Sequence, residues 1–272
     1  MAAIVETASV SAEELAEWAG VGPVIEETRA ELEALATTLG KPAPRLVAVS
    51  KTKPNAAVLA GVAVGQLAFG ENYVAELCEK APLLPAEIQW HFIGHLQSNK
   101  AKPLVEGVPN LFVVESVDSA KLAKKLDNAV KASRPDRPLR VMAQVNTSGE
   151  ASKSGAEPGD DAVELCRYID KECENLVLVG LMTIGRYGED CSDCFECLAT
   201  NRDRVAEELS ITGPGGAALE LSMGMSADYV QATQCGSTNV RVGSSIFGSR
   251  AYKASSAAAD EANAAKAAAS AV

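Results

Sequence analysis

The sequence is poor in several residue types, and each shortage excludes a class of protein. Aromatic residues make up 4% of the 272 residues, and histidine occurs only twice. Basic residues number 25 against 36 acidic ones, so the formal net charge is −11. Such a chain lacks the excess of lysine and arginine that non-specific nucleic-acid binding or docking on anionic membranes uses. No apolar run approaches the roughly 20 residues that a membrane span needs.

The start of the chain and its cysteines indicate a cellular compartment. Residues 1–10 lack a basic segment followed by an apolar stretch, so we expect no secretory signal. They are also not Arg-rich and acid-poor, as an organelle transit peptide would be. The seven cysteines are an odd number in a long chain, which favours a reducing compartment over a disulfide framework. We therefore expect a cytoplasmic protein that binds neither nucleic acid nor membranes.

Short β-branched segments alternate with helical patterns along most of the chain. Strands are expected at residues 46–49, 67–70, 88–94, 111–115, 139–146, 176–184, 219–222 and 240–247. Helices are expected at residues 24–39, 56–64, 71–80, 118–132, 162–172, 193–209 and 228–233. This alternation is typical of β-α units with a parallel sheet.

The number of expected strands indicates whether the sheet closes into a barrel. Eight is the strand number that closes a β/α barrel, and an apolar fraction of 47% is enough to fill one large core. We therefore predict an α/β fold with a single (β/α)8 barrel over residues 21–252. An extension (1–20) with an extra N-terminal helix at 12–19 precedes it, and an Ala-rich tail (253–272) follows. An open, doubly wound sheet is the alternative, because periodicity alone does not show closure.

In such a barrel the functional site lies at the C-terminal ends of the strands, where Lys51 is the most informative residue. A strand that turns Val47 and Val49 toward the barrel axis also turns Lys51 there. A lysine in a water-poor pocket has a lowered pKa, and its neutral amine can form a Schiff base with an aldehyde. The alternative is a lysine that simply ends a strand in solvent.

The second candidate feature is the glycine-containing segment 240–248. In this fold a phosphate site after the last two strands is frequent. Gly243 would let backbone N–H groups approach an anion, and the hydroxyls of Ser222 and Ser244 could add donors. The alternative is a tight turn with ordinary barrel packing. A reactive lysine and a phosphate cradle in one barrel mouth together suggest pyridoxal 5′-phosphate.

Several runs of residues resemble one known family, the pyridoxal phosphate homeostasis proteins. They occur in the expected order over roughly residues 21–252, and they are LVAVSKTKP (46–54), FGENY (69–73), WHFIGHLQ (90–97), QVNTSGE (144–150), GLMTIG (180–185), LSMGMS (221–226) and GSTNVR (236–241). The family is similar to the barrel domain of alanine racemase. The resemblance therefore implies a barrel that binds pyridoxal 5′-phosphate and contributes to its storage, buffering and delivery.

The resemblance also implies roles for individual residues. Lys51 would hold the cofactor as a Schiff base, and Asn72 would lie near the pyridine ring. The phosphate would be held by Ser222, Gly243 and Ser244. Arg241 would face the ring nitrogen; because arginine stays protonated, that nitrogen would remain unprotonated and the ring would be a poor electron sink.

Robust catalysis is not expected from this arrangement. The racemases use a second base, a tyrosine on a C-terminal β domain, whereas only 20 residues follow Tyr252 here, mostly alanine. The alternative is a weak amino-acid racemase or lyase whose second base is Tyr73 or Tyr229. A further alternative is a scaffold, monomeric or weakly dimeric, that hands the cofactor to apo-enzymes by direct contact.

Two patterns that could indicate metal sites have structural explanations. Cys191, Cys194 and Cys197 match the spacing of some iron–sulfur ligands, but the fourth cysteine and its following proline are missing. His91 and His95 on a strand would lie about 13 Å apart at roughly 3.3 Å per residue, too far to share one zinc ion. We therefore expect no metal, with the cysteines packing on a helix and the histidines in structural roles.

Overall fold

The computed structural model of the protein describes residues 10–150, 153–186 and 190–248. Eight parallel strands form one closed barrel, and their order around it is their order along the chain. The strands are β1 (Arg45–Val49), β2 (Ala68–Glu71), β3 (Gln89–Phe92), β4 (Leu111–Val117), β5 (Leu139–Gln144), β6 (Leu176–Met182), β7 (Glu220–Met225) and β8 (Asn239–Val242). Closure is made by β1 and β8, with Val47 opposite Arg241. The predicted barrel is confirmed, and the open sheet is excluded.

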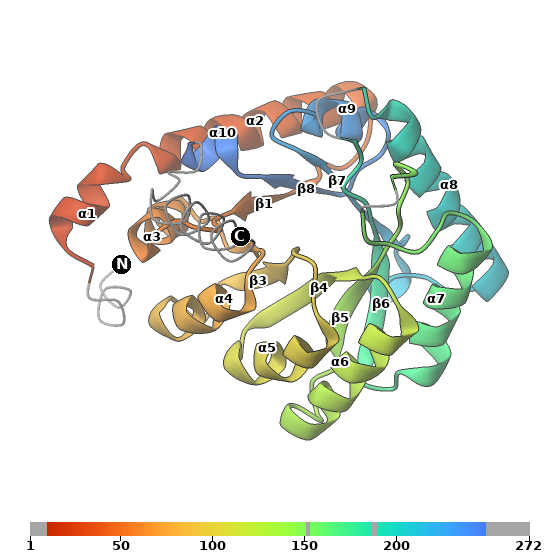
Figure 1. Cartoon of the computed structure of the whole chain (residues 1–272). Helices are drawn as coiled ribbons and strands as arrows, with labels where there is room; N and C mark the ends of the chain where they lie inside the picture. The colour runs from red at the N-terminus through yellow and green to blue at the C-terminus, as the bar shows by residue number, and fades with distance from the viewer. Residues whose placement is uncertain (1–9, 151–152, 187–189, 249–272) are drawn as a thin grey trace, which may run out of the picture.

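Helices surround the barrel (Figure 1). They are α1 (Ala12–Glu17), α2 (Val21–Leu39), α3 (Asn55–Ala63), α4 (Val74–Lys80), α5 (Ala101–Gly107), α6 (Ala120–Ser133), α7 (Asp160–Glu172), α8 (Ser192–Leu209), α9 (Tyr229–Gln234) and α10 (Ser244–Phe247), with short 3-10 turns at Ala81–Leu83, Ser98–Lys100 and Pro214–Gly216. The extra N-terminal helix is α1, which begins with a Ser11 capping box. None of the helices in the described ranges is long and apolar enough to cross a membrane. The predicted tail (253–272) lies outside the described residues.

Apart from shifts at the ends of elements, such as Glu71, which ends β2 instead of beginning a helix, two parts of the secondary structure differ from the prediction. Residues 244–247, expected to continue the last strand, form the short helix α10, in which the amides of Ile246 and Phe247 donate to the carbonyl of Gly243. Both side chains are buried. A short run of buried apolar residues has no period that distinguishes a helix from a strand. Helix α5 was not predicted, because Pro103 lies within it. A proline is tolerated there because the amides of a helix's first turn have no partner within the helix.

Most of the apolar core lies between the strands and the helices. The largest fully buried side chains include Phe69, Trp90, Phe92 and Phe195. A smaller cluster of Val113, Met142, Val179 and Met182 is separate from this outer core. Neighbouring strands approach closely at Gly180, where an added Cβ would lie 2.2 Å from the carbonyl oxygen of Glu220 on β7.

Gly180→Ala is expected to lower the free energy of unfolding by about 2 kcal/mol, because the new methyl group overlaps a backbone that cannot move without disturbing the β6–β7 pairing. Denaturant unfolding would measure the change. Gly20→Ala is the matched control, since an added Cβ there meets nothing within 4 Å. Equal stability of the two variants would contradict this packing.

Candidate functional site

Lys51 follows β1 at the C-terminal end of the barrel. Leu46 and Ala48 belong to the outer core, whereas Val47 and Val49 would both touch a Cβ added to Gly70, so these two valines share the opposite face. The alternation that predicts an inward lysine therefore holds along the strand. Lys51 itself is half-buried in a turn in which the amide of Lys53 donates to the carbonyl of Ser50 at 3.1 Å.

The glycine-containing segment after β8 lies against the end of β1. An added Cβ at Gly243 would lie 3.2 Å from the Cβ of Val49, so the two strand ends are in close contact. Ser244 follows as the exposed first residue of α10. The amides of Gly243 and Ser245 both donate to the hydroxyl of Ser226, at 3.1 and 3.4 Å. The structure thus places this segment against the end of β1, two residues before Lys51.

Asn72 lies in the loop that follows β2, and it is half-buried. Its side-chain Oδ1 is buried and has no hydrogen-bond partner among the described residues. The loop after β3 approaches closely, since a Cβ on Gly94 would lie 2.1 Å from the carbonyl oxygen of Asn72. An amide oxygen that is buried without a partner is available to a bound polar molecule.

Arg241 lies inside the barrel with 4% of its surface exposed. Its Nη1 donates to the hydroxyl of Ser222 at 2.5 Å, and its Nη2 donates to the carbonyl of Thr183 at 2.7 Å. Burial lowers the pKa of Arg241 from its ordinary value, and the negative charge of Glu115 opposes this shift.

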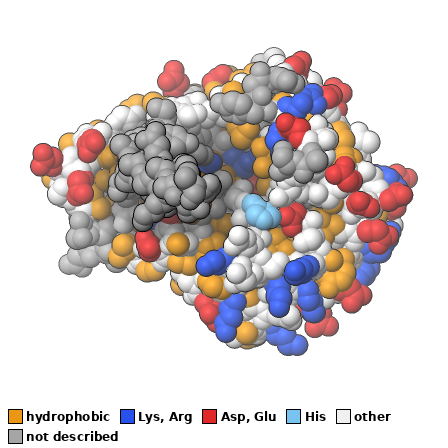
Figure 2. Space-filling model, viewed as in Figure 1, with side chains coloured by type: hydrophobic (Ala, Val, Ile, Leu, Met, Phe, Trp, Pro, Cys, Tyr) orange, Lys and Arg blue, Asp and Glu red, His pale blue; other side chains and the backbone are white. Residues whose placement is uncertain are grey.

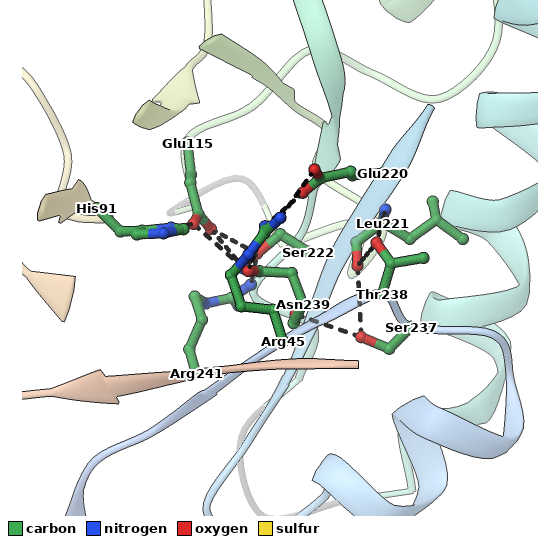
Figure 3. Close-up of polar contacts among 10 residues, drawn as sticks. All are labelled: Arg45, His91, Glu115, Glu220, Leu221, Ser222, Ser237, Thr238, Asn239 and Arg241. Atoms are coloured by element: carbon green, nitrogen blue, oxygen red, sulfur yellow. Dashed lines mark hydrogen bonds and ion pairs between the residues drawn. The ribbon is translucent and has the colours of Figure 1, made fainter. Parts of the chain in front are cut away.

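Glu115 is the fully buried partner of this cation (Figure 3). His91 Nδ1 lies 2.5 Å from Oε1, Ser222 donates its hydroxyl proton to Oε2, and the Asn239 amide donates to both oxygens. Burial acts to raise the pKa of Glu115, but the hydrogen bond and charge of His91, together with the charge of Arg241, outweigh it. The pKa is therefore below its ordinary 4.5.

The hydrogen bonds around Arg241 and Glu115 were only partly predicted from the sequence. Ser222 lies with Arg241 and Glu115 rather than with Gly243 and Ser244, so its predicted contact with a phosphate stays a prediction. Sequence reasoning missed the pairing of His91 with Glu115, the role of Asn239, and Arg45, which bonds Glu220 with both Nη atoms at 2.7 and 3.1 Å. The signal that could have indicated these contacts was the presence of charged and amide residues within otherwise apolar strands.

The residues considered for metal binding have other contacts. His95 is exposed and lies near Ser154 and Asp118, whereas His91 faces Glu115. Cys191 is the residue before the first turn of α8 and exchanges hydrogen bonds with the backbone of Arg186, and burial raises the pKa values of the Cys191 and Cys197 thiols. Within the described ranges no group of three or more potential ligands is placed to hold a metal ion.

The mouth of the barrel can be located on the molecular surface. In Figure 2 the viewed face is hollowed near its centre, with lysine or arginine side chains deep in the hollow and a histidine at its edge. Acidic side chains are scattered around the outside of the same face. A hollow of this kind would attract an anionic molecule although the whole chain is acidic.

Glu115→Gln is expected to lower the free energy of unfolding by about 3 kcal/mol at neutral pH, because it leaves the buried Arg241 cation without a carboxylate. Since the folded-state pKa of Glu115 is depressed, its contribution is complete above pH 4.5 and is lost as the pH falls through the folded-state value. The stability difference from wild type should therefore shrink on acidification. Denaturant unfolding at several pH values measures it, with exposed Glu157→Gln as control; a difference independent of pH would contradict the assignment.

The chain was compared with curated proteins and family models. No protein-family model matches it. The human pyridoxal phosphate homeostasis protein is 48% identical over 218 residues, which cover 77% of this chain and 78% of the human protein. Proteins of the same name from Caenorhabditis elegans and Haemophilus influenzae are 46% and 38% identical to this chain. Each match covers 87% of the length of the relative.

Solved structures give a consistent result. PipY from Synechococcus elongatus PCC7942, in a structure with pyridoxal phosphate bound, is 30% identical with a TM-score of 0.70, and the match covers 84% of this chain and 100% of PipY. Alanine racemase from Streptomyces coelicolor A3(2) is 17% identical with a TM-score of 0.62, and the match covers 87% of this chain and 59% of the racemase. The racemase likeness shows a common fold alone. By its identity and coverage against the curated relatives, the chain belongs to the pyridoxal phosphate homeostasis protein family.

Proposed function

We propose that this protein binds pyridoxal 5′-phosphate through Lys51 and contributes to the storage, buffering and delivery of the cofactor. The observation that carries the proposal is the contact between Val49 and Gly243, since Lys51 follows Val49 by two residues and Gly243 belongs to the segment that we expect to hold the phosphate. The name of the curated relatives and the cofactor in the PipY structure support it.

The residues present fit such a ligand. Lys51 would hold the aldehyde carbon, and Ser244 would offer its hydroxyl to the phosphate beside Gly243, whose amide donates to the Ser226 hydroxyl. Ser222 donates to Glu115 and accepts a hydrogen bond from Arg241, so its contact with the phosphate stays a prediction. When bound, the cofactor supplies a reactive aldehyde on a ring that can withdraw electrons.

Two further groups would contact the ring. The unpartnered Oδ1 of Asn72 would lie beside it as a hydrogen-bond acceptor. Arg241 would face the ring nitrogen as a cation, held charged by Glu115, and a facing positive charge disfavours protonation of that nitrogen. This arrangement favours binding over carbanion chemistry on an amino acid.

The racemase or lyase alternative needs a second base, and the geometry does not favour one. The hydroxyl of Tyr229 donates to Glu31 of α2 at 2.6 Å, and burial, together with that bond, raises the pKa of Tyr229 to about 12. Such a phenol is a poor base near neutral pH. Tyr73, the other candidate, is 46% exposed.

The cellular setting is part of the same proposal. All seven cysteines lie in the described part of the chain, and all are free thiols, which supports a reducing, cytoplasmic location. There the protein would act as a monomer or weak dimer and hand the cofactor to apo-enzymes. A transfer rate that rises with acceptor concentration, beyond free release, would indicate direct contact.

Lys51→Ala is expected to abolish the covalent adduct that borohydride traps between protein and cofactor. The reason is that no other amine would occupy the same place beside Gly243 and Ser244. Mass spectrometry of the reduced protein measures the adduct. Lys131→Ala, which removes an exposed lysine of α6, is the control and should keep it. An adduct fully retained in Lys51→Ala would contradict the assignment.

The cofactor-loaded protein is expected to exchange no Cα proton of alanine or serine for deuterium in heavy water, because a ring nitrogen facing Arg241 stabilises a carbanion weakly. Nuclear magnetic resonance of the recovered amino acid measures the exchange, against free cofactor at the same concentration. Exchange well above that of the free cofactor would favour the enzyme alternative.

A further inference from the structure

The turn that carries Lys51 is attached to a buried cluster of charges. The cluster consists of Glu71 at the end of β2 and of Glu76 and Lys80 on α4. Glu71 is fully buried, and Lys80 is 7% exposed. Burying a charge destabilises the fold unless the charge is paired and hydrogen-bonded. The contacts of these three side chains therefore show which parts of the backbone they fix.

Lys80 fixes the peptide group that precedes Lys51. Its Nζ donates to Glu71 Oε1 at 2.9 Å and to Glu76 Oε1 at 2.5 Å. The third donor of the ammonium group goes to the carbonyl oxygen of Ser50 at 2.9 Å. The hydroxyl of Ser50 donates in turn to Glu71 Oε1 at 2.7 Å. The residue before Lys51 is thus bonded to the cluster through both its backbone and its side chain.

Glu76 fixes the peptide group that follows Lys51. The amide of Thr52 donates to Glu76 Oε1 at 2.6 Å. Thr52 has a φ of 64°, in the left-handed region that residues other than glycine seldom adopt. A hydrogen bond to a carboxylate is stronger than one between neutral groups and helps to keep the turn in this conformation.

We infer that Glu76 and Lys80 are positioning residues for Lys51. Both peptide groups that flank the lysine are bonded to one ion-pair cluster, so the direction in which its side chain leaves the backbone depends on that cluster. Condensation of an amine with an aldehyde is fast only when the two groups are held in the right orientation. This inference rests on the proposed binding of pyridoxal 5′-phosphate by Lys51.

Glu76 is the residue to change in a test. Removing Lys80 would leave Glu71 without its cation, and burial already raises the pKa of that carboxyl. The side chain of Glu76 is 23% exposed, and Glu76→Ala frees the Thr52 amide while Lys80 and Glu71 remain paired. Glu76→Gln restores an uncharged acceptor. Glu79→Ala, at an exposed position of the same helix, is the matched control.

The experiment compares two properties of each variant. The first is the rate at which pyridoxal 5′-phosphate forms its adduct with the protein, followed by absorbance. The second is the affinity for pyridoxine 5′-phosphate, which has an alcohol in place of the aldehyde and cannot condense with an amine. Thermal unfolding checks that each variant is folded.

Glu76→Ala should slow adduct formation about tenfold and leave the affinity for pyridoxine 5′-phosphate unchanged, because both contacts that are lost, with the Thr52 amide and with Lys80, support the lysine turn and not the segment expected to hold the phosphate. Glu76→Gln should restore most of the rate, and Glu79→Ala should match wild type. An unchanged rate in Glu76→Ala, or an equal loss of rate and of pyridoxine 5′-phosphate affinity, would overturn the inference. A wild-type protein that forms no adduct would instead overturn the proposed function.

Discussion

A guanidinium group inside the barrel is the constraint on which the rest of the interior depends. Arginine is not deprotonated in proteins, so Arg241 brings a positive charge into the barrel interior, where 4% of its surface is exposed. Its hydrogen bonds to Ser222 and Thr183 use two of its donors but do not neutralise the charge, and Glu115 has that role. The carboxylate in turn requires donors of its own, which His91 and the neighbouring strands supply. A closed sheet with polar side chains in register is therefore a condition for the charge to be buried at all.

The same register connects the interior to the mouth. Val47 lies opposite Arg241 across the β1–β8 pair, and side chains two residues apart on a strand share a face. The next positions on that face are Val49 and Gly243, which are in contact, and beyond them comes Lys51. Arg241, Gly243 and Lys51 thus follow one another from the barrel interior toward its mouth. Lys80 of α4 bonds the backbone beside Lys51.

Much of this could be predicted from the sequence, and the remainder could not for physical reasons. Strand periodicity is local, so it indicated that Lys51 lies at the barrel mouth, and the number of strand segments indicated closure. The place of Arg241 was implied only by the family resemblance. Residues 244–247 were assigned to a strand because a few buried apolar residues have no distinct period. The partners of Glu115 lie on β3, β7 and β8, up to 124 positions away along the chain, and no local pattern joins them. The contact of Lys80 with the Ser50 carbonyl is equally non-local, since it depends on how α4 packs on the barrel.

The proposed function depends on the Lys51 amine holding the cofactor beside Gly243 and Ser244. A crystal structure of the protein soaked with pyridoxal 5′-phosphate tests it most directly. We expect continuous electron density from Lys51 Nζ to the aldehyde carbon, the phosphate beside Gly243 and Ser244, and the ring nitrogen facing Arg241. Density joined to a different lysine, or a mouth that stays empty at saturating cofactor, would contradict it.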